Sequence, residues 1–249
     1  MRHILLFLLL SVTAAASTLS AAENEKNILR FSASSTWPMP YGQIKDGVLV
    51  DGFMLDIANA ISKEMGLEPQ IIVLPRNRTE QGALSGAYDI RCHLTKKWVP
   101  DPDLFIWSEP LFVFSTIVIG HKGTPRVKKL SDLNGKTLGT VLGYSYPALN
   151  EAIDQGKIIR DDTENQTAAY QKVGVGNNLY AVTDELSFEY YLKTSGKRLQ
   201  FAKWQLELSS DVSHCAILKK SKVDPMQINK AIQRLKRDGT IDKILARYR

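Results

Sequence analysis

The segment from Val50 to Gly66 carries the pattern that most restricts how this chain can fold. Its apolar residues recur three or four positions apart, which places them along one side of a helix. These residues are Met54, Ile57, Ala58, Ile61 and Met65. Gly66 is a typical helix end, and the β-branched runs at Leu29–Ser34 and Gln70–Leu74 predict strands on either side. A strand, a helix and a strand in this order predict a parallel α/β sheet.

The N-terminal residues 1–22 predict export. A positive Arg2, the apolar stretch Ile4–Leu10 and the small residues Ser20-Ala21-Ala22 form a secretory signal that is cleaved near Ala22. The apolar stretch is too short to span a bilayer. A lipid anchor would need a cysteine at the cleavage point, and neither cysteine of the chain lies there.

Composition argues against nucleic-acid binding. The chain has 32 Lys and Arg against 26 Asp and Glu, a net charge of +6, and loss of Arg2 with the signal leaves +5. The basic residues are dispersed, apart from Lys219–Lys222 and Lys230–Arg237, where a solvated helix face explains them. We expect no nucleic-acid partner.

The order of the remaining elements indicates two α/β units in succession. A second series of strands and helices begins after the loop Gly123–Asp132, which we interpret as lying just beyond a domain crossing. We predict strands at residues 88–94, 116–121, 137–142, 180–183, 198–203 and 214–218, and helices near residues 80–85 and 147–155, after Asp184, and twice at the C-terminus.

Six segments in this order carry a resemblance to a known family. They are GFMLDIANAISKEMGL, ALSGAYDI, WSEPLF, LSDLNGKTLGTVLG, VTDELSFEYYL and AIQRLKRDGTIDKIL. The chain resembles the extracytoplasmic solute-binding proteins of family 3, the polar amino-acid type. This implies an α/β, two-lobe periplasmic-binding-protein fold of type II, with the lobes joined by two hinge strands. The expected division is signal peptide 1–22, lobe 1 at 23–115 and 216–249, and lobe 2 at 116–215.

A zwitterion enclosed between two lobes needs donors for its carboxylate and a carboxylate for its ammonium. In lobe 2, Gly143-Tyr144-Ser145 stands where the family has its Gly-Thr-Thr turn at a helix N-terminus. Asp184 matches the aspartate that receives the amine. Alternatively, Ser145 and Asp184 are ordinary helix N-caps, and for Asp184 both roles can coexist.

Lobe 1 departs from the family pattern. The clamp arginine of the family falls near Trp98–Asp101, where this chain has no arginine. Thr95 matches the donor threonine only if the alignment slips by about one residue. Lys96 or Lys97 would supply a point charge where arginine supplies a fork, and Trp98 would cover the apolar part of a ligand.

Two loops supply further candidates for the ligand site. Arg76 and Arg78 stand where many relatives carry an aromatic residue, and together they favour an anionic ligand. Trp37 and Tyr41 would wall the cleft. The alternatives are that both arginines are solvated on a loop and that the two aromatic residues only pack.

The strand at residues 88–94 is unusual for an inner strand. Alternation places Asp89, Arg91 and His93 on one face. We interpret Asp89 and Arg91 as an ion pair, and His93 as lying nearer the end of the strand where ligands bind. No second ligand at a recognisable spacing supports a metal role for His93.

Cys92 lies in this strand, and Cys215 lies in the strand that returns to the first lobe. In the sheet that the resemblance implies, the two strands can lie side by side. We expect one disulfide in an oxidising compartment. The alternative is that both cysteines are buried apolar residues.

The resemblance implies a periplasmic protein that captures a small polar solute, anionic or amino-acid-like, for an ABC importer. Its partners would be the ligand and the permease subunits, and the protein would be a monomer without cofactor or catalysis. Two alternatives stay open: a sensor that acts on a membrane signalling partner, and a dehydratase-like enzyme on the same fold.

Overall fold

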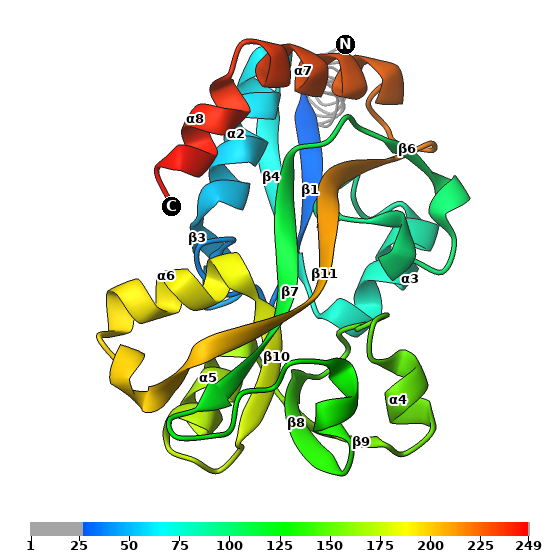
Figure 1. Cartoon of the computed structure of the whole chain (residues 1–249). Coiled ribbons are helices and arrows are strands. Elements are labelled where there is room, and N and C mark those ends of the chain that lie inside the picture. Colours follow the sequence, from blue (N-terminus) through cyan, green and yellow to red (C-terminus); the bar gives the residue numbers. More distant parts are fainter. Residues whose placement is uncertain (1–26, 249) are drawn as a thin grey trace, which may run out of the picture.

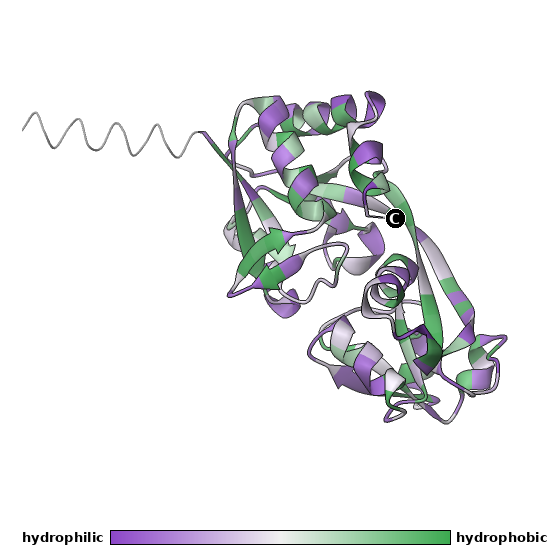
Figure 2. Cartoon of the chain, turned by 90° about the vertical axis from the view of Figure 1, so that its left-hand side faces the viewer, coloured by the Kyte–Doolittle hydropathy of each residue, from purple (hydrophilic) through white to green (hydrophobic). Residues whose placement is uncertain are grey.

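The computed structural model describes residues 27–248, so the signal segment predicted at residues 1–22 lies outside the described residues. The described chain forms two α/β lobes that two long strands connect (Figure 1). Viewed from the side, apolar strands run through each lobe, and the helices alternate polar and apolar residues (Figure 2). Within residues 27–248, no helix is long and apolar enough to cross a membrane.

Lobe 1 is built on the predicted parallel unit. Strand β1 (Ile28–Ser34) pairs in parallel with β4 (Glu68–Leu74) and with β5 (Ile90–Leu94). Between β1 and β4 lie the hairpin β2 (Gln43–Lys45) and β3 (Val48–Asp51) and then helix α2 (Phe53–Met65). Residues Met54, Ile57, Ala58 and Ile61 of α2 are buried as predicted, and Gly66 ends the helix in the left-handed conformation, with φ of 68°.

The remaining elements of lobe 1 come from distant parts of the chain. The short helix α3 (Thr79–Ser85) precedes β5, and β6 (Phe105–Trp107) pairs with the end of the last strand. The C-terminal helices α7 (Pro225–Arg237) and α8 (Thr240–Ala246) pack on α2.

Lobe 2 contains β8 (Lys136–Val141), β9 (Ile158–Thr163) and β10 (Tyr180–Asp184), and β8 runs parallel to both of its neighbours. Helices α4 (Asn150–Asp154), α5 (Gln166–Gly174) and α6 (Glu185–Ser195) complete the lobe. Strand β9 and helix α5 were not predicted from the sequence.

Two strands pass between the lobes. Strand β7 (Phe112–His121) and strand β11 (Phe201–Leu218) pair antiparallel from Phe201 opposite His121 to Ser213 opposite Phe112. Phe112 and Cys215 belong to the core of lobe 1, whereas Ile117 and Phe201 belong to a core of lobe 2. We propose that the lobes divide at residues 115/116 in β7, as predicted, and near Ser210 in β11, which lies opposite Ser115, because Cys215 already belongs to the core of lobe 1.

Three of the predicted elements differ from the structure in their extent. The helix expected at residues 147–155 is only α4, from Asn150 to Asp154. The strands expected at residues 198–203 and 214–218 are the two ends of the single strand β11, which begins at Phe201 after a helical turn at Arg198–Gln200.

Candidate functional site

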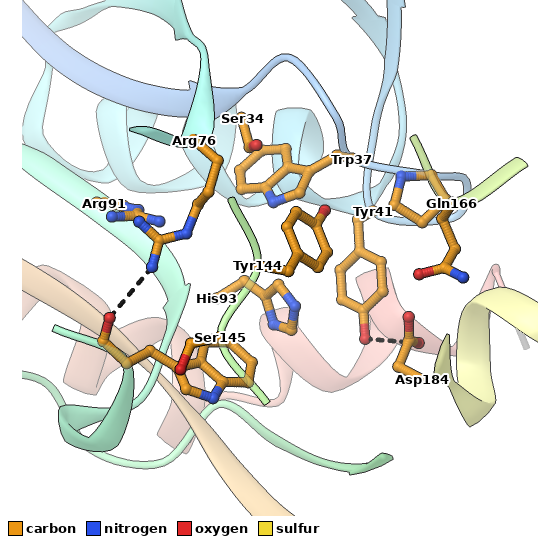
Figure 3. Close-up of a pocket in the computed structure, with 12 residues that line it drawn as sticks. Ser34, Trp37, Tyr41, Arg76, Arg91, His93, Tyr144, Ser145, Gln166 and Asp184 are labelled. Atoms are coloured by element: carbon orange, nitrogen blue, oxygen red, sulfur yellow. Dashed lines mark hydrogen bonds between the residues drawn. The ribbon is translucent and has the colours of Figure 1, made fainter. Parts of the chain in front are cut away.

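A cavity of about 80 Å³ lies between the two lobes. Its side chains come from both lobes and point toward one another (Figure 3). Lobe 1 contributes Ser34, Trp37, Pro38, Tyr41, Arg76, Arg91, His93 and Trp98, and lobe 2 contributes Tyr144, Ser145, Gln166 and Asp184. Because residues of both lobes form its wall, the cavity depends on how closely the lobes approach.

Arg91 is a buried cation in the wall of the cavity. It lies within β5 and is 7% exposed. Burial, with a smaller contribution from the nearby Arg76 charge, lowers the pKa of Arg91 to about 10, so the guanidinium stays charged at neutral pH. The ion pair expected between Asp89 and Arg91 is wrong, because the carboxylate of Asp89 pairs with Arg30 at 2.7 Å. Among residues 27–248, Arg91 takes part in no ion pair.

His93 reaches the cavity through a β-bulge. Arg91 lies opposite Ala216 and Leu94 lies opposite His214, so two residues of β5 face Cys215 alone. His93 has a positive φ of 56°, which is uncommon outside glycine. Its ring stacks on Tyr41 with the centroids 4.1 Å apart. Burial lowers the pKa of His93 to about 3, so the ring is neutral at pH 7.

Arg76 is held in place by lobe 1 itself. Its guanidinium donates to Glu80 at 2.6 Å, to the Thr79 hydroxyl at 3.0 Å and to the carbonyl oxygen of Trp98 at 3.1 Å. Arg76 therefore has a counter-ion within its own lobe, in contrast to Arg91.

Asp184 ends β10 and caps α6. Its Oδ1 accepts from the Ser187 N–H at 2.8 Å, and its Oδ2 accepts from the Ser187 hydroxyl. The Tyr41 hydroxyl donates to Oδ1 at 3.0 Å across the cleft. Burial raises the pKa of Asp184 above its ordinary value. Among residues 27–248, Asp184 has no cationic partner.

The turn Gly143-Tyr144-Ser145 also faces lobe 1. The Tyr144 hydroxyl donates to the Thr36 carbonyl oxygen at 3.2 Å, and a Cβ on Gly143 would meet the Arg76 side chain at 3.6 Å. Burial raises the pKa of Tyr144 to about 12. No helix follows this turn directly, so the expected helix N-terminus at Ser145 is wrong.

Four of the candidate residues lie outside the wall of the cavity. Arg78 and Lys96 are exposed, Thr95 accepts a hydrogen bond from the Lys97 N–H at 3.4 Å, and Gly143 borders the wall beside Arg76. Lys97 pairs with Asp211 at 2.6 Å.

Five lining residues were not among the candidates for ligand binding: Ser34, Pro38, Arg91, His93 and Gln166. The charged pattern of β5 pointed to Arg91, but we assigned it a local partner. His93 had been placed near the ligand without a role in binding.

Cys92 and Cys215 form a disulfide in the structure, which ties β5 to β11 directly beside His93.

Within residues 27–248, no group of three or more His, Cys, Asp or Glu side chains is arranged to hold a metal ion. The wall of the cavity is thus made of aromatic rings, a few polar groups, two arginines and one carboxylate.

Comparison with known proteins gives consistent relatives. The model of the bacterial extracellular solute-binding proteins, family 3, matches residues 29–249. The L-cystine-binding protein TcyA of Bacillus subtilis (strain 168) is 24% identical over 230 residues, which cover 92% of this chain and 83% of that protein.

Solved structures match over almost the whole length of the described chain. An ancestral arginine-binding protein bound to arginine has a TM-score of 0.73 at 24% identity, covering 89% of this chain and 98% of that one. An ancestral amino acid-binding protein, a precursor of cyclohexadienyl dehydratase, has a TM-score of 0.71 at 21% identity, covering 90% and 96%. At this identity the matches show the fold, which is the predicted two-lobe architecture.

Proposed function

The chain belongs to the bacterial extracellular solute-binding proteins of family 3, and we propose that it captures a small amino-acid-like zwitterion for an ABC importer. The observation that carries this proposal is a pair of opposite charges on opposite walls of the cavity. Arg91 of lobe 1 and Asp184 of lobe 2 both face the cavity, and neither takes part in an ion pair among residues 27–248, although the charge of Glu80 also acts on Arg91.

An uncompensated charge in a poorly hydrated site is unfavourable, and the remedy is a partner of opposite sign. A zwitterion supplies both partners at once. Its carboxylate compensates Arg91, and its ammonium compensates Asp184. Each contact joins the ligand to a different lobe, so the ligand favours the closed arrangement over the open one.

Closure is also what a transporter can recognise. Tyr41 and Asp184 bond across the cleft, as do Tyr144 and Thr36, and the pairing of β7 with β11 connects the lobes along one side. We propose that ligand binding stabilises this closed form and that permease subunits bind it. The protein acts as a monomer in this scheme.

The N-terminal sequence and the family together support a proposal for where the protein works. The signal pattern of residues 1–22 supports export and cleavage near Ala22. A soluble carrier that serves an importer must stay near the membrane, so we propose the periplasm. N-terminal sequencing of the periplasmic fraction should give Glu23, and a first residue of Met1 would contradict this.

We propose binding without catalysis. One solved relative is described as a binding-protein precursor of a dehydratase, which shows that the fold is compatible with both activities. In the wall of the cavity, as far as the described residues form it, His93 is neutral and Asp184 accepts hydrogen bonds from Ser187, which does not suit an acid and base pair. Turnover of a carboxylic acid by the purified protein would overturn this part of the proposal.

The Asp184→Asn variant tests the zwitterion directly. The amide oxygen can still accept from Ser187 and Tyr41, so the unliganded protein should unfold at the same temperature or slightly higher. Native mass spectrometry of freshly purified protein identifies the amino-acid ligand, and calorimetry measures its affinity. The affinity of the variant should be at least about 30-fold lower, because the ligand ammonium loses its counter-ion. An unchanged affinity would mean that the ligand has no ammonium group that binds Asp184.

A further inference from the structure

We propose that Arg91 replaces the missing clamp arginine of the family and that the ligand is a compact neutral amino acid, without a charged side chain. This inference rests on the proposed function and specifies the class of ligand. Trp98 occupies the segment where the resemblance places the clamp, so the carboxylate must be held from another position.

Among the described residues, two cations line the cavity, and they differ in how many of their N–H donors are already used. Arg76 uses its guanidinium on Glu80, Thr79 and the Trp98 carbonyl oxygen. Arg91 takes part in no ion pair among the described residues and is more deeply buried. Binding at Arg91 therefore stabilises the ligand carboxylate most, because the guanidinium can donate two parallel hydrogen bonds to it.

The described residues that form the rest of this wall supply no counter-ion for a third charge. Once Arg91 and Asp184 hold the carboxylate and the ammonium, and Glu80 compensates Arg76, the lining left over is aromatic or neutral. It consists of Ser34, Trp37, Pro38, Tyr41, His93, Trp98, Tyr144, Ser145 and Gln166. A guanidinium, ammonium or second carboxylate on the ligand side chain would lose its water there without gaining a partner.

The size of the cavity points the same way. At about 80 Å³ it has room for roughly five to eight waters, since one water needs about 10–15 Å³. That suits a ligand of the size of alanine, serine or proline. Arginine and cystine, which the names of two relatives mention, are much longer.

On the side of Arg91, a longer ligand would have to pass this side chain. The Arg91 side chain also lines a second cavity of about 90 Å³, whose other walls include Leu84, Tyr88, Val99 and Phe105. Arg91 stands between the two cavities. A ligand that extended into the second cavity would displace the guanidinium, which is the group that we assign to its carboxylate.

The first test is a titration panel on the exported, processed wild-type protein. L-alanine, L-serine and L-proline are compared by calorimetry with L-arginine, L-cystine and propionate. We expect at least one of the first three to bind at least about 100-fold more tightly than arginine and cystine. Equal or tighter binding of arginine or cystine overturns the inference but leaves the proposed function intact. Binding of propionate as tight as that of alanine, or the absence of binding by every amino acid, overturns the proposed function.

The second test determines whether Arg91 binds the ligand carboxylate. Arg91→Gln should weaken binding of the tightest compact amino acid at least about 100-fold, and Arg91→Lys, which keeps the charge but loses the fork, at least about 10-fold. Arg78→Gln is the matched control, because Arg78 is exposed and outside the cavity, and its affinity should equal that of wild type. Circular dichroism of each unliganded variant checks folding. If Arg91→Gln does not fold, Arg91→Lys decides, and wild-type affinity in that variant overturns the assignment.

Discussion

His93 should make the protein sensitive to acid. The ring lies among Tyr41, Trp98 and Phe112, and no residue of the described chain pairs with its Nδ1. Because burial lowers its folded pKa to about 3 from an ordinary value of 6.5, the unfolded chain binds more protons between these values. The stability that neutral His93 allows is thus fully present above pH 6.5 and is lost as the pH falls toward 3.

The variant that isolates this effect is His93→Asn, since asparagine tolerates a positive φ. Between pH 7 and pH 5, wild type should lose about 2 kcal/mol more unfolding free energy than the variant. Denaturant unfolding at the two pH values measures the difference. Equal losses in the two proteins would show that protonation of His93 is accommodated.

Short-range patterns located the candidate site better than they located its ion pairs. Trp37, Tyr41 and Trp98 were expected at the cleft from residue type and from their places in the family pattern, and all three line the cavity. Arg91 was assigned to Asp89, two residues away. In the structure Asp89 bonds to Arg30, which is 59 residues away in the chain. No local pattern reveals such a partner, and without it Arg91 could not be recognised as uncompensated.

At the scale of elements, periodicity predicted α2 and failed for α4. The stripe of α2 runs over more than three turns and meets a core on one side only. Before α4, the buried Tyr146 accepts a hydrogen bond from the Val141 N–H at 3.0 Å, which ties the chain back to β8. A contact to the preceding strand thus overrides the helical pattern until Asn150.

The disulfide between Cys92 and Cys215 is expected to hold β5 against β11. It spans 123 residues of sequence, so it restricts the unfolded chain strongly. The double variant Cys92→Ala, Cys215→Ala should lower the free energy of unfolding by about 2–4 kcal/mol. Chemical denaturation measures this loss, and peptide mapping without reduction checks the bond. Two free thiols in the unfolded, non-reduced protein would contradict the pairing.

At the scale of the whole molecule, six ordered motifs were enough to predict two lobes and two connecting strands. The distance between the lobes in the closed form could not be predicted from the sequence, because it depends on contacts between residues more than a hundred positions apart. Thr36 and Tyr144 are separated by 108 positions, and Tyr41 and Asp184 by 143. These contacts exist only while the lobes are closed, so their energies report on closure.

A double-mutant cycle on Thr36 and Tyr144 should therefore measure closure in solution. The Thr36 hydroxyl donates to the Tyr144 hydroxyl at 3.2 Å, and the two residues belong to different lobes. Thr36→Val should weaken ligand binding about 3- to 10-fold, as expected for one hydrogen bond between neutral groups. Tyr144→Phe should weaken it at least as much, because the Tyr144 hydroxyl also donates to the Thr36 carbonyl oxygen. The loss of affinity in the double variant should be smaller than the product of the two single losses, with a coupling energy of about 0.5–1 kcal/mol.

Scattering of X-rays in solution should show a smaller radius of gyration when ligand is added to wild type. A cycle without coupling and an unchanged radius would mean that the lobes do not close on the ligand, and the transporter would then need another signal of the loaded state.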